Sequence, residues 1–264
     1  MAEWARRVSG FSLVLLVTAG VGHRYGLVET VAFLWTLVLV AGLAVLGIVL
    51  AAGGFARLWW HGDKAGRASL TAALLSILVL APFGVSVWLY WRLPALTDIS
   101  TDLEQPPGFV VTPQFRDSQM NAIRPIAPEA AALQMQAYPD IAGRRLDASP
   151  ERVLAAIAPV IAARGWKVRG GMPISAGAPE ILIEMEAPSF LLRFPADAVV
   201  RLIDEEETTF VDMRIAARYG PHDLGASARR IGAFMTALEA ELERQSLQII
   251  DIPPSSDGDV DRID

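Results

Sequence analysis

Residues 30–56, TVAFLWTLVLVAGLAVLGIVLAAGGFA, contain no charged side chain. The hydrocarbon core of a bilayer is about 30 Å thick, and a helix that rises about 1.5 Å per residue crosses it in about 20 residues. A helix of this length without charge is rare inside a soluble protein, so the stretch predicts a transmembrane helix. Residues 68–91, ASLTAALLSILVLAPFGVSVWLYW, predict another, with terminal aromatic residues that are typical of a membrane interface.

A further apolar segment precedes these two and is shorter. Residues 8–22 offer fewer positions than a usual membrane span. The segment could cross a membrane if Arg7 and Arg24 extend their charged ends to the interface, or it could be a cleaved signal peptide with a basic start. No clear cleavage site follows it, so we expect a retained helix over about residues 8–26. Residues 1–92 would then hold three transmembrane helices.

Charge divides the chain at the end of the last apolar segment. Residues 1–92 carry roughly +4, and residues 93–264 carry roughly −10. Basic residues concentrate before the first segment and between the second and third, and the positive-inside rule places such residues in the cytoplasm. We therefore expect a bacterial inner-membrane protein with a cytoplasmic N-terminus and a periplasmic C-terminal portion. That portion lacks the basic footprint of a nucleic-acid-binding protein, so we expect no nucleic-acid partner. The transmembrane helices make the lipid bilayer the expected partner.

Cysteine is absent, and His222 is the only histidine after residue 92. The water-exposed portion therefore has no disulfide, no thiolate zinc site, no cysteine nucleophile and no histidine-rich metal site. We expect neither a metal nor a cofactor.

The water-exposed portion divides into three regions. Residues 93–149 are rich in proline, which favours extended chain over helix. Composition alone leaves open whether this region is a disordered stalk or an ordered strap that is docked by its aromatic residues. Residues 150–245 predict a compact domain, and the acidic residues 246–264 predict a disordered tail.

Alternating apolar and polar residues predict the strands of the compact domain. In residues 209–219, TFVDMRIAARY, every second side chain from Val211 is apolar, and residues 180–186 show a similar alternation. A helix capped by Ser149 precedes the strands, and a helix over about residues 223–244 follows them. This order predicts an α+β fold. We expect three transmembrane helices, followed by an antiparallel sheet of three or four strands with two helices packed on one face.

The opposite face of this sheet is expected to be polar. Its side chains would be Glu184, Glu186, Arg201, Asp212, Arg214 and Arg218. Opposite charges on neighbouring strands predict cross-strand ion pairs. The stretch RYGPHDLGASARRI at 218–231 adds His222, Asp223 and Arg230 where the last strand leads into the last helix.

Three interpretations of this charged corner are open. In the first it is structural, with Asp223 capping the last helix and an arginine of the preceding strand holding Asp223. In the second, Arg214, Arg218, His222, Asp223 and Arg230 bind an anion such as a lipid head group near the start of the helix. In the third, His222 and Asp223 perform acid–base chemistry in a hydrolase, although no G-x-S-x-G turn is present.

Three stretches resemble a known family: DISTDLEQPPGF (98–109), YPDI (138–141) and MRIAARYGPHDLGASARRIGAF (213–234). They are similar to the bacterial and plastid family called domain of unknown function 1499, in which three membrane helices often precede the domain. The resemblance implies no established activity. The last family motif is roughly R-S-x-S-R-x-G-x-x-D-x-G-x-N-x-x-R-I, and here Ile215, Ala217 and Ser227 replace its two serines and its asparagine. The retained arginine and aspartate framework implies a structural lock and an ordered strap.

We therefore expect a non-catalytic binding or assembly module, such as a subunit or accessory factor of a membrane complex. A lipid- or anion-binding domain is the alternative, and a hydrolase is the third hypothesis. A membrane protein or a lipid ligand is the corresponding partner. In this hypothesis the strap lies across the polar face, and Asp98, Asp102 or Asp140 pairs with Arg214 or Arg218. The residues of this lock would be Asp98, Asp102, Tyr138, Asp140, Arg201, Arg214 and Asp223.

Overall fold

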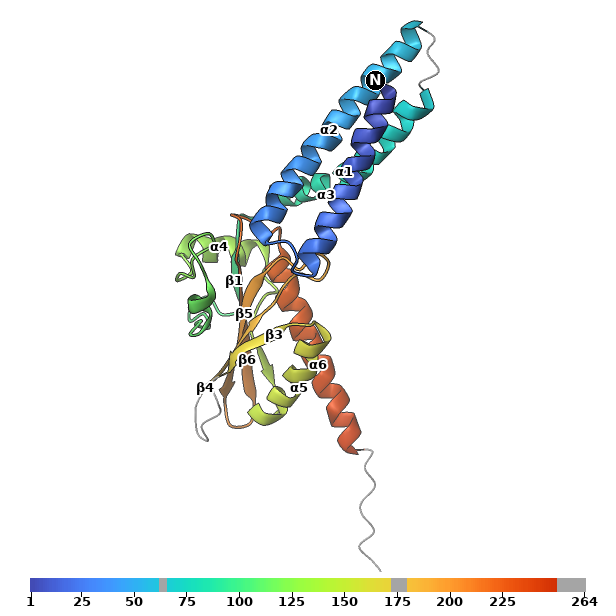
Figure 1. The fold of residues 1–264 in the computed structure, drawn as a ribbon. Coiled ribbons are helices and arrows are strands. Elements are labelled where there is room, and N and C mark those ends of the chain that lie inside the picture. Colours follow the sequence, from blue (N-terminus) through green and yellow to red (C-terminus); the bar gives the residue numbers. More distant parts are fainter. Residues whose placement is uncertain (62–65, 172–179, 251–264) are drawn as a thin grey trace, which may run out of the picture.

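The computed structural model describes residues 1–61, 66–171 and 180–250. Figure 1 shows a bundle of three long helices that is joined at one end to a domain of strands and helices. The bundle consists of α1 (Ala2–Arg24), α2 (Thr30–His61) and α3 (Gly66–Arg92). All three helices are long and apolar enough to span a membrane. The chain is therefore a membrane protein, and the predicted three-helix region is confirmed.

Helix α1 begins earlier than the sequence indicated. It starts at Ala2 rather than near residue 8, and its length is 23 residues. Arg6 forms an ion pair with Glu3 at 2.8 Å, one turn apart on the helix surface. The first turns can therefore be helical although they are charged. The predicted start near residue 8 was too late because it was based on the apolar positions alone.

Small and polar side chains hold the three helices together. The hydroxyl groups of Ser9 and Ser76 share a hydrogen bond of 2.9 Å between α1 and α3, and the Ser12 hydroxyl donates to the carbonyl oxygen of Val40 at 2.9 Å. These three serines have no exposed surface. In lipid, close packing and hydrogen bonds of this kind replace the hydrophobic effect as the force between helices.

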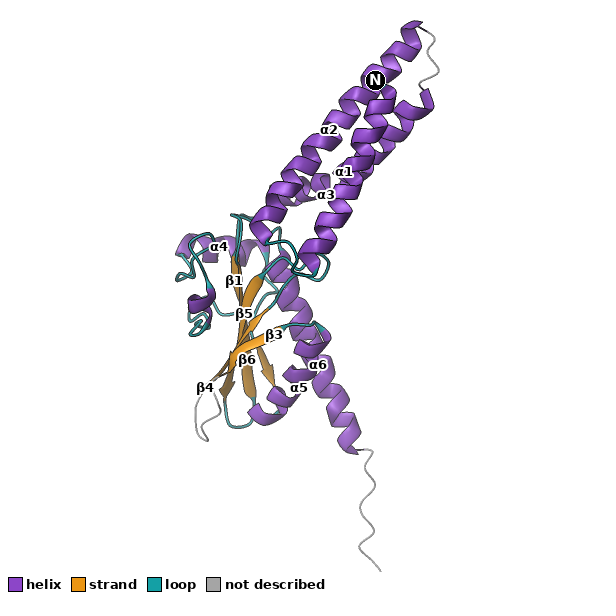
Figure 2. Ribbon diagram, viewed as in Figure 1, coloured by secondary structure: helices purple, strands orange, loops and turns teal. Residues whose placement is uncertain are grey.

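The domain is built on one antiparallel sheet (Figure 2). Its strands are β1 (Asp98–Ser100), β2 (Arg144–Leu146), β3 (Lys167–Gly171), β4 (Glu180–Glu186), β5 (Ala196–Asp204) and β6 (Thr209–Ala217). The order across the sheet is β1, β6, β5, β4, β3, and β2 also pairs with β6. β1 pairs with residues 214–216 and β2 with residues 209–211, so the two short strands share one edge of β6.

The sheet thus has six strands rather than the predicted three or four. The additional strands β1 and β2 have three residues each, too few to show an alternating pattern in the sequence. Gln134 of α4 (Pro128–Ala137) continues the pairing beyond β1. Its side-chain amide accepts from the N–H of Ser100 at 3.1 Å and donates to the carbonyl oxygen of Ser100 at 2.6 Å. A side chain thereby satisfies backbone groups at an otherwise free sheet edge.

Two helices, α5 (Pro150–Ala163) and α6 (Ala226–Ile250), cover one face of the sheet, as predicted. Figure 1 shows them side by side. Ile157 and Leu238 from these helices belong to one core with Met185 and Met213 from the strands, and none of the four is more than 1 % exposed. Burial of a side chain of this size stabilises a protein by about 1.5–3 kcal/mol. This layer is therefore the main hydrophobic core of the domain.

Helix α6 has different ends from those predicted. It begins at Ala226 rather than at residue 223, because Asp223 precedes the helix and caps it. It continues to Ile250, so residues 246–250 are helical and not part of a disordered tail. Residues 251–264 of the predicted tail lie outside the described residues.

The strap, residues 93–149, covers the other face of the sheet. It contains the 3-10 helix η1 (Thr112–Phe115) and α4, and Figure 1 shows it on the side opposite α5 and α6. Residues 196–202 of β5 and 211–217 of β6 are consequently buried on both faces of the sheet. The strap is therefore a packed layer of the domain, and the polar sheet face lies beneath it.

Candidate functional site

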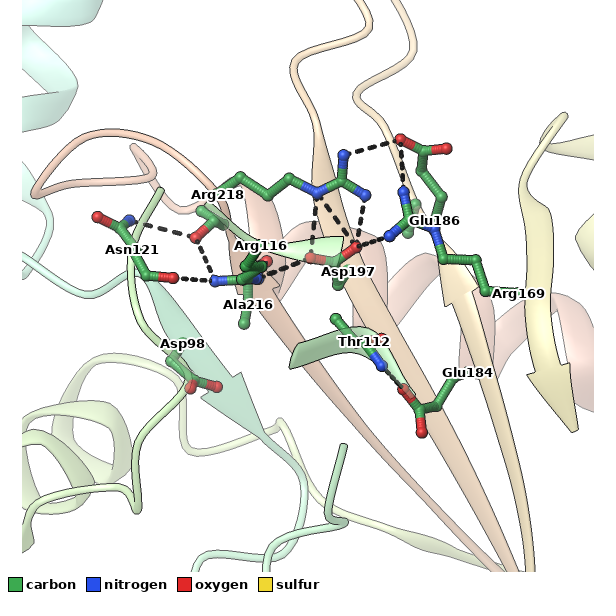
Figure 3. Close-up of polar contacts among 12 residues, drawn as sticks. Asp98, Thr112, Arg116, Asn121, Arg169, Glu184, Glu186, Asp197, Ala216 and Arg218 are labelled. Carbon is green, nitrogen blue, oxygen red and sulfur yellow. Dashed lines mark hydrogen bonds and ion pairs between the residues drawn. The ribbon is translucent and has the colours of Figure 1, made fainter. Parts of the chain in front are cut away.

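The polar face of the sheet carries a network of ion pairs that Figure 3 shows in close-up. At its centre is Asp197 of β5, whose side chain has no exposed surface. Arg218 binds both carboxylate oxygens at 2.6–3.2 Å. Arg116 of the strap binds the same carboxylate at 2.9 Å, and Arg169 of β3 lies 3.7 Å from it. A lone buried carboxylate would cost several kcal/mol, so these partners are needed to keep Asp197 inside the domain.

All three of these arginines have further partners, and Arg169 pairs with Glu186 at 3.4 Å. The guanidinium of Arg116 donates to the carbonyl oxygens of Asn121 at 2.5 Å and Ala216 at 2.9 Å, and so ties the strap to β6. Arg218 also pairs with Glu186 at 3.0 Å. Burial lowers the pKa of Arg218, but its hydrogen bonds with Asp197 and the attraction of that carboxylate raise the pKa above its usual value. Arg218 is therefore a fixed structural charge.

Glu184 of β4 holds the strap without using an arginine. Its side chain is 3 % exposed, and its carboxylate accepts backbone N–H groups from Val110 at 2.6 Å, Val111 at 2.8 Å and Thr112 at 2.7 Å. These amides lie at the start of η1, where N–H groups have no partner within the helix. A carboxylate at such a position satisfies several donors at once.

Asp98 and Arg214, which the lock hypothesis pairs, do contact each other. Arg214 binds the two carboxylate oxygens of Asp98 at 2.9 and 2.7 Å. It also donates to the carbonyl oxygen of Arg124 at 2.7 Å and lies over the ring of Phe109. Only 5 % of Arg214 is exposed, so an added anion would have to compete with partners from the strap.

The other two strap carboxylates, Asp102 and Asp140, do not form the ion pairs that the hypothesis predicted. Asp102 contacts Arg201 at 3.1 Å instead of Arg214 or Arg218, and Arg201 forms a two-bond pair with the buried Asp212. Asp140 is exposed and forms no ion pair within the described part of the chain. The reason is its position in a turn after α4, beyond the region where the strap crosses the polar face.

His222 joins the corner to the end of α3. Its Nε2 lies 3.1 Å from the carbonyl oxygen of Leu93, and its Nδ1 lies 2.8 Å from the backbone nitrogen of Leu224. A carbonyl oxygen can only accept, so Nε2 carries the proton and Nδ1 accepts the N–H of Leu224. The ring also packs against Tyr90, with 5.0 Å between centroids. Both nitrogens are engaged by the backbone, and neither is free to act as a base.

Asp223 caps α6, as the structural interpretation expected. Its carboxylate accepts the N–H groups of Gly225 at 2.8 Å and Ser227 at 2.7 Å. No arginine of the described residues forms an ion pair with it, so the expected contact with an arginine of the preceding strand is absent. Tyr138 lies close to the same turn, and burial, followed by the negative charge of Asp223, raises the pKa of its hydroxyl.

A second joint connects the domain to α1. Nδ1 of His23 donates to the carbonyl oxygen of Leu192 at 2.7 Å, and the His23 ring stacks on Phe33 of α2 at 4.4 Å. Arg24 donates to the carbonyl oxygens of Phe190 and Leu191 at 2.6 and 2.7 Å. The loop between β4 and β5 is therefore bound to the end of the bundle.

Cavities open near these joints. One of about 830 Å³ lies between the α1–α2 connection and the domain, where Arg218 and Glu186 form part of its wall. Two others, of about 360 and 330 Å³, share Arg229 and Arg230 at the start of α6. Within the described residues, no group of three or more histidines or carboxylates is placed to hold a metal ion.

The residues of the predicted anion site fall into two places. Arg214 and Arg218 lie under the strap, whereas His222, Asp223 and Arg230 line the same cavity of about 360 Å³. Of the residues in the network around Asp197, the sequence did not lead us to Asp197, Arg116 or Arg169. Asp197 lies four residues before Arg201 on the same strand, so the alternation places both on the polar face and could have revealed Asp197. No signal in the sequence marks Arg116 among the other polar residues of the strap.

Comparison with known proteins gives one match. A family model described as "Protein of unknown function (DUF1499)" matches residues 98–238, which run from β1 into α6. A search of curated proteins and a search of solved structures found no match. The matched region contains most of the strap, the whole sheet, α5 and the first part of α6, and it covers more than half of the chain. The protein therefore belongs to the DUF1499 family of proteins of unknown function.

Proposed function

We propose that this chain is a bacterial inner-membrane protein whose periplasmic domain is a non-catalytic binding or assembly module, such as a subunit or accessory factor of a membrane complex. The observation that carries the proposal is the use of the charged side chains. Asp197 and Asp212 are fully buried and bound by arginines, and both nitrogens of His222 are bound by backbone groups. The groups that a hydrolase would need are instead used to hold the strap and the corner.

The way in which the domain is mounted supports a role in assembly. Five residues, 93–97, separate α3 from β1, and His23 and His222 provide two further joints. A domain held at three points presents one surface at a constant height above the bilayer. Such a fixed surface suits the docking of a membrane-protein partner.

The proposed orientation can be tested with single cysteines, because the natural chain contains none. Gln136→Cys lies in the domain, where residue 136 is exposed, and Lys64→Cys lies in the basic connection between α2 and α3. A membrane-impermeant maleimide applied to intact spheroplasts should label Gln136→Cys and not Lys64→Cys. The reverse pattern would place the domain in the cytoplasm.

The partner is tested by native mass spectrometry of the full-length protein after gentle purification from its own membranes. A stoichiometric protein partner supports the assembly function. A bare monomer that hydrolyses a substrate, and loses this activity in His222→Ala, would contradict it and support the hydrolase hypothesis.

Lipid or anion binding is the second candidate function. The observation in its favour is the pair of cavities that share Arg229 and Arg230, one of which is also lined by Leu34 of α2 and Leu89 of α3. In the same mass spectrometry experiment, this function would be seen as a bound mass of lipid size instead of a protein.

A further inference from the structure

Two groups of arginines, one under the strap and one where the domain meets the bundle, have different kinds of partner. Under the strap, each arginine of the network binds a carboxylate. At the end of the domain that meets the bundle, arginines donate to backbone carbonyl oxygens and form no ion pair within the described part of the chain. These are Arg24, Arg164, Arg193, Arg229 and Arg230. A carbonyl satisfies a donor but does not cancel its charge, so this end of an acidic domain is locally positive.

Arg229 and Arg230 stand between two cavities. The cavity of about 360 Å³ is also lined by Leu34 of α2, Leu89 of α3 and Phe194. Leu34 lies near the start of α2 and Leu89 near the end of α3, so the wall of this cavity is continuous with the lipid-facing part of the bundle. It thus has apolar side chains of the bundle on one side, and Arg229 and Arg230 together with His222 and Asp223 of the domain on the other.

The second cavity, of about 330 Å³, adds a third arginine. Its wall includes Arg164 and Trp166 beside Arg229 and Arg230. Arg164 donates to the carbonyl oxygens of Val160 at 3.1 Å and Ala233 at 2.6 Å. The guanidinium groups of Arg164, Arg229 and Arg230 therefore line one cavity beside the start of α6. Asp223 is a carboxylate whose negative charge acts on Arg230.

Arg230 forms no ion pair within the described residues, although the nearby carboxylate of Asp223 attracts its charge. It donates through Nε to the carbonyl oxygen of Ala226 at 3.1 Å and through Nη1 to that of Ala187, whereas Nη2 donates to no group of the described chain. Burial lowers the pKa of Arg230 to about 10, so the side chain is still charged at neutral pH. The carboxylate of Asp223 accepts amides of the α6 cap and keeps its negative charge, but it forms no ion pair with Arg230, so Nη2 is able to donate to an external anion.

We propose that Arg229 and Arg230, with Arg164, bind the phosphate of an anionic phospholipid from the surrounding bilayer. One acyl chain of this lipid lies along the apolar wall of the 360 Å³ cavity, against Leu34 and Leu89. Arginine suits this ligand because its planar donors match phosphate oxygens in pairs. The inference deepens the second candidate function, lipid binding, and rests on it.

The loop between β4 and β5 supports a lipid as the source of the phosphate. Phe190 and Leu191 are 87 % and 72 % exposed, although both are apolar. Arg24 at the end of α1 donates to the carbonyl oxygens of both residues, so these side chains lie at the end of the bundle that meets the domain. Apolar side chains beside basic ones are typical of a surface that enters the interface of an anionic bilayer.

The test uses the full-length protein, delipidated in detergent and titrated with palmitoyl-oleoyl phosphatidylglycerol, with bound lipid counted by native mass spectrometry. Arg229→Gln/Arg230→Gln removes two charges and keeps amide donors. Arg145→Gln/Arg244→Gln is the matched control, because both of its arginines are exposed and lie in surface pairs with glutamates. We expect one tightly bound lipid, a loss of affinity of about tenfold or more in the first variant, and no change in the control.

A second variant separates a lipid from free phosphate and does not touch the arginines. Leu89→Trp adds bulk to the apolar cavity, and it should weaken binding of phosphatidylglycerol but not of inorganic phosphate. If Leu89→Trp binds the lipid normally and inorganic phosphate displaces it, the site takes free phosphate and the lipid inference is overturned. Equal binding of zwitterionic phosphatidylcholine would overturn the choice of an anionic ligand.

The outcomes also separate this inference from the function on which it rests. If the unmodified protein takes up no phosphatidylglycerol, lipid binding itself fails. If the unmodified protein and Arg229→Gln/Arg230→Gln take it up equally, lipid binding stands and the assigned site is wrong. A thermal unfolding curve for each variant shows whether a loss of binding reflects loss of the fold.

Discussion

The attachment of the strap should depend on Glu184 more than on any single arginine contact. Glu184→Gln keeps the shape of the side chain but replaces one acceptor oxygen by a donor NH₂ group. The carboxylate accepts three N–H groups, from Val110, Val111 and Thr112, at 2.6–2.8 Å. Whichever way the amide turns, at least one N–H faces a donor. Each hydrogen bond to a charged group contributes about 1.5–3 kcal/mol, so we expect the free energy of strap opening to fall by about 2–4 kcal/mol.

Hydrogen exchange of the full-length protein in detergent, read by mass spectrometry, measures this quantity directly. Each 1.4 kcal/mol corresponds to a factor of about ten, so amides of residues 110–112 should exchange about 30- to 700-fold faster. Glu180→Gln is the matched control, because Glu180 lies at the exposed start of the same strand. Unchanged exchange of the strap in Glu184→Gln would refute the reasoning. So would an equal increase throughout α6, because the variant would then destabilise the whole domain rather than the strap.

Four further outcomes follow from the same contacts. Asp197→Asn should destabilise the domain by about 3–5 kcal/mol, because it leaves the charges of several buried arginines uncancelled. Asp212→Asn should destabilise the domain less. Equal decreases of the unfolding temperature in the two variants would contradict this order. His222→Ala removes two backbone contacts and should cost about 1–2 kcal/mol, seen as faster exchange of residues 93–97. Gly225→Ala should cost about 1–3 kcal/mol in a thermal unfolding assay, since Gly225 has φ +70° and an added Cβ would lie 2.8 Å from a leucine methyl group. The raised pKa of Tyr138 means that the folded state holds the phenol proton more tightly, so stability present below pH 10.0 is lost as the pH rises through the folded pKa; Tyr138→Phe should lose less stability over this range.

The parts of the fold that the sequence predicted are those governed by long patterns. An uncharged run of residues 30–56 has few alternatives to a membrane helix, and nine-residue strands such as β6 show their alternation clearly. The same alternation placed Arg201, Asp212 and Arg214 on one face, where the structure has them. It did not find β1 and β2, because three residues carry no period and their pairing with β6 depends on the packing of the whole strap.

The partners of charged residues were less predictable, for a physical reason. Sequence reasoning pairs a charge with an opposite charge, and it succeeded for Asp98 and Arg214. Glu184 is instead satisfied by backbone amides, and Arg230 by backbone carbonyls. Almost every residue has these backbone groups, so the sequence does not indicate which of them a charged side chain will contact. The locally positive end of the domain is likewise assembled from separate segments that meet only after folding.

The arginines of the family motif consequently have two kinds of partner. Its first half contributes Arg214 and Arg218, whose charges are cancelled by Asp98 and Asp197 under the strap. Its second half contributes Arg230, which donates to carbonyl oxygens, forms no ion pair within the described residues and lines the two smaller cavities. Loss of an arginine from the first half leaves a buried carboxylate unpaired, so its effect should appear in stability whether or not a ligand is present. Loss of Arg230 leaves no carboxylate unpaired, so its effect should appear in binding of an anionic lipid. A motif with one purpose would show the same effect at both positions.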